Sequence, residues 1–289
     1  MNDEIRSYLD RVLQIVGRQK VACVVAYGSS LSAVTRSSTS TPDFFVIVDA
    51  YPEFYASRFH AILNAFLPPN VYHYKLGNSQ SKYSVVSLTR LRKESRFPSD
   101  LYLAGRFSKK IEVAWSRNEA TTQEVLGIQR ACARAVAEKT LPLMPARFSL
   151  DEFCQAAIRL SYLGDVRVEA KDKIQKLFDA DPAFYRETYA PILVDLGIAR
   201  EETGYRKDPH PADAIRRLLV QGFLLSCKIR AQLRWPKAMF TASDWLDYVL
   251  QKIERTQGIR IDLTARQKKL WFIYGWKYFL LLKRKNLIK

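Results

Sequence analysis

The chain of 289 residues has few of the residues that build disulfide scaffolds or metal centres. It has four cysteines and three histidines, and none of them stands at a CxxC or Cys/His ligand spacing. Each cysteine lies within an apolar run, which indicates a buried thiol in a reducing compartment. The sequence therefore excludes a disulfide-stapled domain and gives no sign of a zinc site.

Long hydrophobic segments are also missing. No window reaches the ~18 uninterrupted apolar residues of a membrane-spanning helix. The first twenty residues carry acidic side chains and apolar residues at helical spacing, unlike a signal peptide or an Arg-rich transit peptide. We therefore expect a cytoplasmic protein, soluble or bound to a membrane only peripherally, and the lack of a transit peptide suggests a bacterial origin.

Acidic residues are in short supply relative to basic ones. The chain has 46 Lys and Arg against 29 Asp and Glu, a formal net charge of +17, while its hydrophobic content of 48% allows a substantial core. Such a surplus indicates an anionic partner: nucleic acid, a phospholipid surface or phosphorylated substrates. Charge by itself does not choose among these partners.

Hydrophobic periodicity divides the chain into two regions. The first predicts an opening helix, a helix over 52–66, and strands over 21–27, 43–50, 71–76, 82–88, 101–105 and 110–115. From Thr121 onward the pattern is helical, and Ser149 with Glu152 predicts a capping box. We expect an α/β (α+β) fold, a nucleotidyltransferase-like mixed sheet domain over 1–120 followed by a helical domain over 121–289.

A glycine-serine turn and an isolated carboxylate stand at the ends of the first two predicted strands. Gly28-Ser29 lets backbone N–H groups approach a phosphate, and Asp43 on the next strand can hold Mg²⁺ beside it. Together they are the working parts of nucleotidyl transfer. The alternative, an ordinary turn followed by a strand-start aspartate, stays open at this point.

The usual second carboxylate, two residues away on the same strand, is missing. Thr41 and Phe45 occupy those positions, and Asp49 lies about 20 Å further along an extended strand. We therefore expect Glu112, on a later predicted strand, to supply the second metal ligand.

Five ordered motifs resemble the mitochondrial-type phosphatidate cytidylyltransferases, the translocator assembly and maintenance family. They are AYGSS (26–30), PDFFVIVD (42–49), KYSVV (82–86), LYLAGR (101–106) and LSYLGDVR (160–167). Departures from the family pattern are Ser30 and Ser84 in place of glycines and Lys110 in place of a proline.

The resemblance implies that phosphatidic acid attacks the α-phosphate of CTP, giving CDP-diacylglycerol and pyrophosphate with Mg²⁺. It implies catalytic roles for Asp43, Lys82, Arg106, Asp165 and Arg167. It further implies nucleotide contacts from Tyr27, Gly28, Ser29, Ser30, Lys82 and Tyr83. The expected partners are CTP, phosphatidic acid and an anionic membrane surface, with no nucleic acid, and the enzyme is expected on the inner face of the membrane, or in mitochondria in the eukaryotic family.

The C-terminal segment Ala265–Lys289 combines an interrupted apolar centre with tryptophan, tyrosine and flanking lysines. Such a segment favours the membrane interface, although a terminal helix packed on the core would have the same composition. Two other functions remain open: nucleotidyl transfer to RNA or a small-molecule acceptor, and a non-catalytic nucleic-acid- or lipid-binding relative.

Overall fold

The computed structural model describes residues 3–28, 31, 41–77, 79–164, 171–241, 263–264 and 267. The chain divides into two compact units, Met1–Lys237 and Ala238–Lys289. The predicted membrane-contact segment Ala265–Lys289 lies outside the described residues except at position 267, and its role stays a prediction. Within the described part of the chain, no helix has the length and apolar character needed to cross a bilayer.

A five-stranded mixed sheet organises the N-terminal half of the first unit. Its strands are β1 (Cys23–Tyr27), β2 (Asp43–Val48), β3 (Asn70–Leu76), β4 (Ser79–Ser87) and β5 (Ile111–Ser116). They lie in the order β3-β4-β2-β1-β5, with β2 and β4 parallel and the other neighbours antiparallel. The central strands β1 and β2 are buried except at Asp43, because helices cover both faces of the sheet. The predicted α/β fold with a mixed sheet is confirmed.

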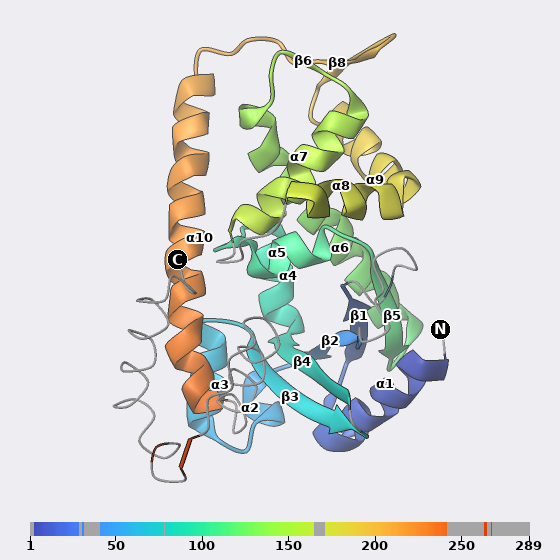
Figure 1. Ribbon diagram of the computed structural model, residues 1–289, viewed down its shortest axis with the longest axis vertical. Helices are drawn as coiled ribbons and strands as arrows, with labels where there is room; N and C mark the ends of the chain where they lie inside the picture. Colours follow the sequence, from blue (N-terminus) through green and yellow to red (C-terminus); the bar gives the residue numbers. More distant parts are fainter. Residues whose placement is uncertain are drawn as a thin grey trace. The chain divides into compact units, whose positions relative to one another are not determined.

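Successive residues of β2 point to two separate cores. Phe44 and Val46 pack on one face, against residues of α1 (Asp3–Val16), α2 (Tyr51–Phe54) and α3 (Arg58–Phe66). Phe45 and Ile47 pack on the other, against α4 (Leu88–Arg96), α5 (Leu101–Phe107) and α6 (Glu119–Thr140). A short 3₁₀ turn, η1 (Arg18–Lys20), joins α1 to β1. Figure 1 shows this layered arrangement around the sheet.

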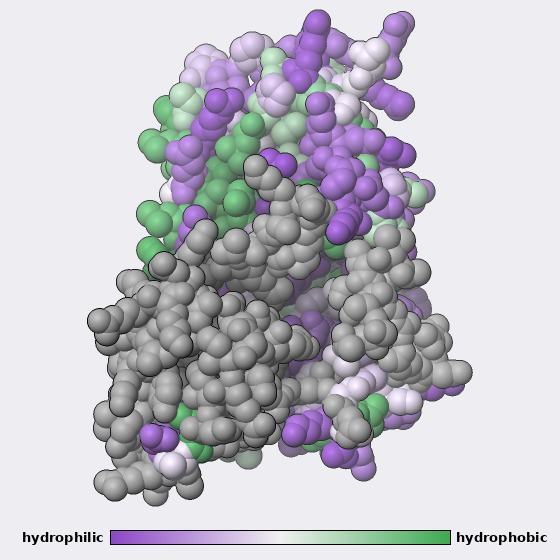
Figure 2. Space-filling view, viewed as in Figure 1, coloured by the Kyte–Doolittle hydropathy of each residue, from purple (hydrophilic) through white to green (hydrophobic). Residues whose placement is uncertain are grey.

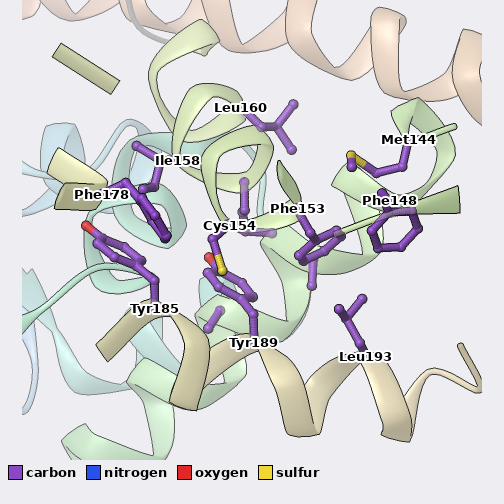
Figure 3. Packing of buried hydrophobic residues seen from close by; sticks show 14 of the residues in the cluster. Met144, Phe148, Phe153, Cys154, Ile158, Leu160, Phe178, Tyr185, Tyr189 and Leu193 are labelled. Carbon is purple, nitrogen blue, oxygen red and sulfur yellow. The ribbon is translucent and has the colours of Figure 1, made fainter. Parts of the chain in front are cut away.

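A third core gathers the later helices. It includes residues of α6, α7 (Leu150–Leu163), α8 (Lys171–Ala180), α9 (Pro182–Asp195) and α10 (Asp213–Thr241), together with the 3₁₀ turn η3 (Leu141–Leu143). Aromatic rings fill its centre (Figure 3): Phe153 lies 5.7 Å from Phe148 and 5.6 Å from Tyr189, measured between ring centroids. Residues of α6 take part in both this core and the sheet core. The predicted division near residue 120 stays a prediction.

Two expectations about single elements were wrong. Residues 101–105 form helix α5 rather than a strand, because Asp100 accepts a hydrogen bond from the Tyr102 N–H (2.7 Å) and starts a helix. A five-residue apolar run fits a buried helix as well as a strand. The helix predicted over 52–66 breaks at extended Tyr55, whose hydroxyl accepts from the Asn64 and Asn70 amides.

Strands also occur in the region predicted to be entirely helical. Three short strands, β6 (Arg147–Phe148), β7 (Ala199–Glu201) and β8 (Gly204–Arg206), form a sheet in the order β6-β8-β7. Runs of two or three residues are too short for hydrophobic alternation to reveal. The predicted capping box is confirmed: the Ser149 hydroxyl accepts from the Glu152 N–H, and the Glu152 carboxylate accepts from the Ser149 N–H.

Candidate active site

The candidate site lies where β1 ends and β2 begins. The register pairs Tyr27 with Asp43 and Asp43 with Lys82, so the three side chains share one face of the sheet. Lys82 Nζ lies 3.0 Å from Asp43 Oδ2, and each of these side chains is about a quarter exposed, at 24% and 27%. The pair therefore stands at the solvent boundary, where an anionic ligand can reach both groups.

Gly28 turns the chain immediately after β1. Its φ of +94° lies in the left-handed region that side chains other than glycine rarely adopt. A Cβ at this position would lie 3.9 Å from Asp43 Oδ2, so glycine keeps the space beside the carboxylate open. The next two residues of the motif, Ser29 and Ser30, lie outside the described residues, and their predicted phosphate contacts stay predictions.

Tyr27 places a buried hydroxyl beside this pair. Its ring stacks on Phe45 at 4.5 Å, and its hydroxyl has no hydrogen-bond partner among the described residues. Burial, together with the negative charge of Asp43, raises the pKa of the Tyr27 hydroxyl to about 12, although Lys82 and Arg106 act in the opposite direction. Tyr27 is thus a protonated hydrogen-bond donor at neutral pH, with no acceptor for its proton in the described part of the protein.

Helix α5 contributes a second positively charged side chain, Arg106, in addition to Lys82. The Arg106 guanidinium lies over the Tyr102 ring, 3.6 Å from its centroid, and Nη1 donates to the Tyr102 carbonyl at 2.9 Å. The same helix buries Phe107, whose ring lies 5.0 Å from Phe45 and so connects α5 to the ring under the Tyr27 side chain. Arg106 lies close enough to affect the ionisation of Tyr27, which assigns it to the same electrostatic cluster.

Sequence reasoning missed the group that holds α5 in place. Asp100 is buried, and its Oδ2 accepts from Arg230 Nε at 2.7 Å and from Arg234 Nη2 at 2.6 Å, both on α10. The Arg234 guanidinium also lies 4.5 Å from the Tyr102 ring centroid and donates to the Pro68 carbonyl. Arg230 and Arg234 stand four residues apart, which places both on one side of a helix, but nothing in the sequence indicates that they bind Asp100.

Two of the sequence motifs pack directly on each other. A Cβ on Gly105 would lie 3.1 Å from both Cβ and the carbonyl oxygen of Ser161, so only glycine lets α5 approach α7 this closely. The Lys109 ammonium lies 3.8 Å from the Tyr162 ring centroid. Thus the LYLAGR and LSYLGDVR segments meet, although about sixty residues separate them. Asp165 and Arg167, at the end of the second segment, lie outside the described residues, and their catalytic roles stay predictions.

Glu112 and Tyr83 are not brought into the cluster. The register pairs Glu112 with Ala26, whose side chain lies on the α1-covered face, opposite to Asp43. Tyr83 lies on that face too, where its ring stacks on Tyr72 at 5.2 Å. Their predicted roles, as metal ligand and nucleotide contact, stay predictions that this register does not support. Among the described residues, no group of three or more His, Cys, Asp or Glu side chains could hold a metal ion.

Comparison with known proteins identifies a family. The family model described as "Phosphatidate cytidylyltransferase, mitochondrial" matches residues 62–221, more than half of the chain. This range includes Lys82 and Arg106, whereas Gly28 and Asp43 precede it.

Curated relatives are similar over a shorter stretch. Mitochondrial phosphatidate cytidylyltransferases from Xenopus laevis and Caenorhabditis elegans are each 28% identical, over 41% and 43% of this chain and 35% and 38% of their own length. The human protein is 30% identical over 39% of this chain and 25% of its own length. The match thus spans about a third of the first two relatives.

A solved structure, a nucleotidyltransferase-like protein from Exiguobacterium sibiricum, is 14% identical to this chain. The alignment covers 99% of this chain and 92% of that one, with a TM-score of 0.29. A likeness at this TM-score carries no weight for the fold or the chemistry.

Proposed function

The chain belongs to the mitochondrial phosphatidate cytidylyltransferase family, and on that premise we propose that it transfers the cytidylyl group of CTP to phosphatidic acid. An oxygen of the lipid phosphate attacks the α-phosphorus of CTP, a new P–O–P linkage forms, and the bond to the leaving pyrophosphate breaks. The products are CDP-diacylglycerol and pyrophosphate. The observation that carries this proposal is the Asp43–Lys82 pair beside the Tyr27 hydroxyl, which has no hydrogen-bond partner among the described residues. The three residues lie on neighbouring central strands of a sheet whose later strands and helices match the family.

The site residues fit a reaction that depends on positioning and charge neutralisation. A phosphate monoester oxygen is already anionic near neutral pH, so the acceptor needs no strong general base. Lys82 and Arg106 would neutralise the triphosphate, and the backbone at Gly28 leaves room for a phosphate to approach. Tyr27, whose pKa of about 12 keeps it protonated, would donate a hydrogen bond to a phosphate oxygen and would not act as a base.

A magnesium ion fits this site if it is held jointly with the nucleotide. Mg²⁺ in nucleotide-dependent enzymes is commonly bound by one or two carboxylates, substrate phosphates and water. Asp43 supplies one partly exposed carboxylate, and the open space at Gly28 lies next to its Oδ2. When bound, the ion would neutralise the charge that develops on the pyrophosphate. In that complex Lys82 would exchange its contact with Asp43 for one with a phosphate oxygen.

The test is a transfer assay with the full chain. Each of the four α-labelled ribonucleoside triphosphates is incubated with and without Mg²⁺, and with either phosphatidate vesicles or RNA. We expect labelled CDP-diacylglycerol from CTP with vesicles and Mg²⁺ only. Extension of RNA would show that the acceptor is RNA, and nucleotide or lipid binding without product would indicate a non-catalytic relative. Either result would refute the proposal.

A matched pair of variants tests the role of Asp43. Asp43→Asn removes the charge at the site, and we expect turnover to fall by at least about a hundredfold, the usual scale for a catalytic electrostatic group. Asp49→Asn is the control, since Asp49 lies just beyond the other end of β2 and pairs with Arg117 at the surface. Full turnover by Asp43→Asn would show that the metal and phosphate site lies elsewhere.

A lipid substrate requires contact with a bilayer surface, so we propose that the enzyme works as a peripheral membrane protein. The formal net charge of +17 supports this, because anionic lipids attract basic proteins.

A further inference from the structure

Helix α10 carries a row of apolar side chains that face away from the protein. Between Asp213 and Lys237 these side chains are exposed by 50–68%, and they are Ile215, Leu218, Leu219, Leu225, Ile229 and Leu233. Their spacing of three, four or seven residues places most of them along one side of the helix, which we call the outer face of α10. Figure 2 shows hydrophobic side chains, interrupted by hydrophilic ones, along the edge where α10 runs in Figure 1.

Beyond its first turn, the charged residues of α10 are all basic. After Asp213 in the first turn, the sequence of α10 has no Asp or Glu as far as Thr241. Arg216 and Lys228 are exposed on this stretch, and so is Arg217, whose Nε donates to the Pro142 carbonyl at 2.8 Å. Six large apolar side chains exposed by half or more on one side of a helix indicate an interaction surface, and basic residues on the same helix favour an anionic partner.

We propose that the outer face of α10 binds the surface of an anionic phospholipid bilayer. The leucine and isoleucine side chains enter the boundary between headgroups and acyl chains, while Arg216 and Lys228 contact lipid phosphates. The inference rests on the proposed function, which supplies a lipid substrate. A second copy of the chain fits less well, because a two-fold contact between outer faces would bring like charges together.

The opposite side of α10 connects this face to the candidate site. Arg230 and Arg234 bind Asp100, which caps α5, and Arg234 also contacts the ring of Tyr102. Tyr102 in turn lies against Arg106. A bilayer on the outer face would therefore lie on the far side of the helix that holds α5 and, through Tyr102, the Arg106 side chain.

Vesicle flotation with the full chain tests the proposal. The vesicles are phosphatidylcholine alone or phosphatidylcholine mixed with phosphatidylglycerol, which is anionic but is not the substrate. We expect binding to the mixed vesicles that weakens with added salt. Leu218→Gln/Ile229→Gln should weaken it by about tenfold or more, because each large apolar side chain contributes more than a factor of ten when fully buried.

The matched control is Ile15→Gln/Val194→Gln, which replaces two exposed apolar residues on α1 and α9, at 43% and 57% exposure. Its binding should equal that of the unaltered protein. Equal binding by both double variants would overturn the proposal and direct attention to Ala265–Lys289. A dimer in light scattering that only Leu218→Gln/Ile229→Gln dissociates would overturn it as well, in favour of an interface between copies.

A spectroscopic measurement covers the case in which the double variant does not fold. Gly222 lies on the outer face with no atom within 4 Å of a Cβ added there, and all four native cysteines are buried. A nitroxide attached to Gly222→Cys should lose accessibility to an aqueous relaxation agent when mixed vesicles are added. Unchanged accessibility in vesicle-bound protein would refute the proposal.

Transfer to a short-chain, water-soluble phosphatidate separates this inference from the proposed function. We expect Leu218→Gln/Ile229→Gln to retain that activity while it loses vesicle binding. If the unaltered protein binds vesicles through the outer face but forms no product from either phosphatidate, only the proposed function fails.

Discussion

The contact between Asp100 and α10 makes a quantitative prediction about stability. The Asp100 side chain is 5% exposed, and its two partners, Arg230 and Arg234, are 25% and 14% exposed. Removing one partner of a buried ion pair costs about 3–5 kcal/mol, because the remaining charge loses its counter-ion without regaining water. Arg230 is partly solvated, so we expect Asp100→Asn to lower the free energy of unfolding by about 3 kcal/mol.

Asparagine is the informative replacement because it is nearly isosteric and also caps helices well. Its side-chain oxygen can still accept the Tyr102 N–H, so the loss reports the charge rather than the cap. Asp151→Asn is the control: Asp151 forms a comparably short pair with Arg186, but both side chains are 39–49% exposed. We expect that substitution to change stability by less than about 1 kcal/mol.

The pH dependence gives this prediction a second, independent signature. Burial tends to raise the pKa of Asp100, but Arg234, Arg230 and the Tyr102 N–H outweigh it and hold the pKa below its ordinary value. The contribution of Asp100 is therefore fully present above its unfolded pKa of about 3.9 and is lost as the pH falls through the lower folded value. In urea unfolding followed by circular dichroism, the gap between the two proteins should stay constant from neutral pH to about pH 4 and shrink below it. Equal stability of the Asp100→Asn and Asp151→Asn variants at neutral pH would refute this reasoning.

Three further predictions concern Tyr27, Gly105 and Lys237. Tyr27→Phe removes a buried hydroxyl without a partner among the described residues, so we expect unchanged or slightly higher thermal stability. CTP binding, measured by calorimetry, should be weaker. A loss of stability above about 1 kcal/mol would show that the hydroxyl has a partner within the protein. Gly105→Ala places a methyl group 3.1 Å from Ser161, and we expect a loss of about 1–3 kcal/mol in urea unfolding. Gly222→Ala is its control, because the space there is open and alanine favours helix; equal effects of the two would argue against close packing of α5 on α7. Burial, with a smaller effect from Arg234, lowers the pKa of Lys237 to about 7. Between about pH 7 and about pH 10 the unfolded chain therefore binds more protons than the folded protein, and the free energy of unfolding should rise with pH across that window. Lys237→Gln should flatten this rise in pH-dependent urea midpoints, and an unchanged rise would assign it to another group.

Much of the sheet and of the helical region could be predicted, since each depended on a local pattern. The buried strands β1 and β2 follow from their β-branched and aromatic residues, and the start of α7 follows from the Ser149–Glu152 capping box. Residues 101–105 were predicted to form a strand because so short an apolar run shows neither helical nor strand periodicity. The N-cap at Asp100 makes this segment a helix, α5. The three strands of the small sheet are likewise too short for their sequence to reveal them.

The candidate site divides in the same way. The sequence indicated Gly28, Asp43, Lys82 and Arg106 individually, and the fold brings these residues into one cluster. It could not indicate that Glu112 would lie on the other face of the sheet, because the face depends on the register between β5 and β1. Tyr27 gains its significance only because its hydroxyl is buried without a partner among the described residues, which is a property of the folded protein.

The sequence by itself determined the alternation that sends Phe44 and Phe45 of β2 into different cores, the excess of basic residues, and the glycine that the turn after β1 requires. These depend on one residue or on neighbours a few positions apart. Only the tertiary structure decided that Arg234 would meet Asp100 across 134 positions of the chain, and that α10 would turn its apolar residues outward. Such pairings arise because a long-range contact is selected by how whole elements pack, and no local pattern of residues encodes that choice.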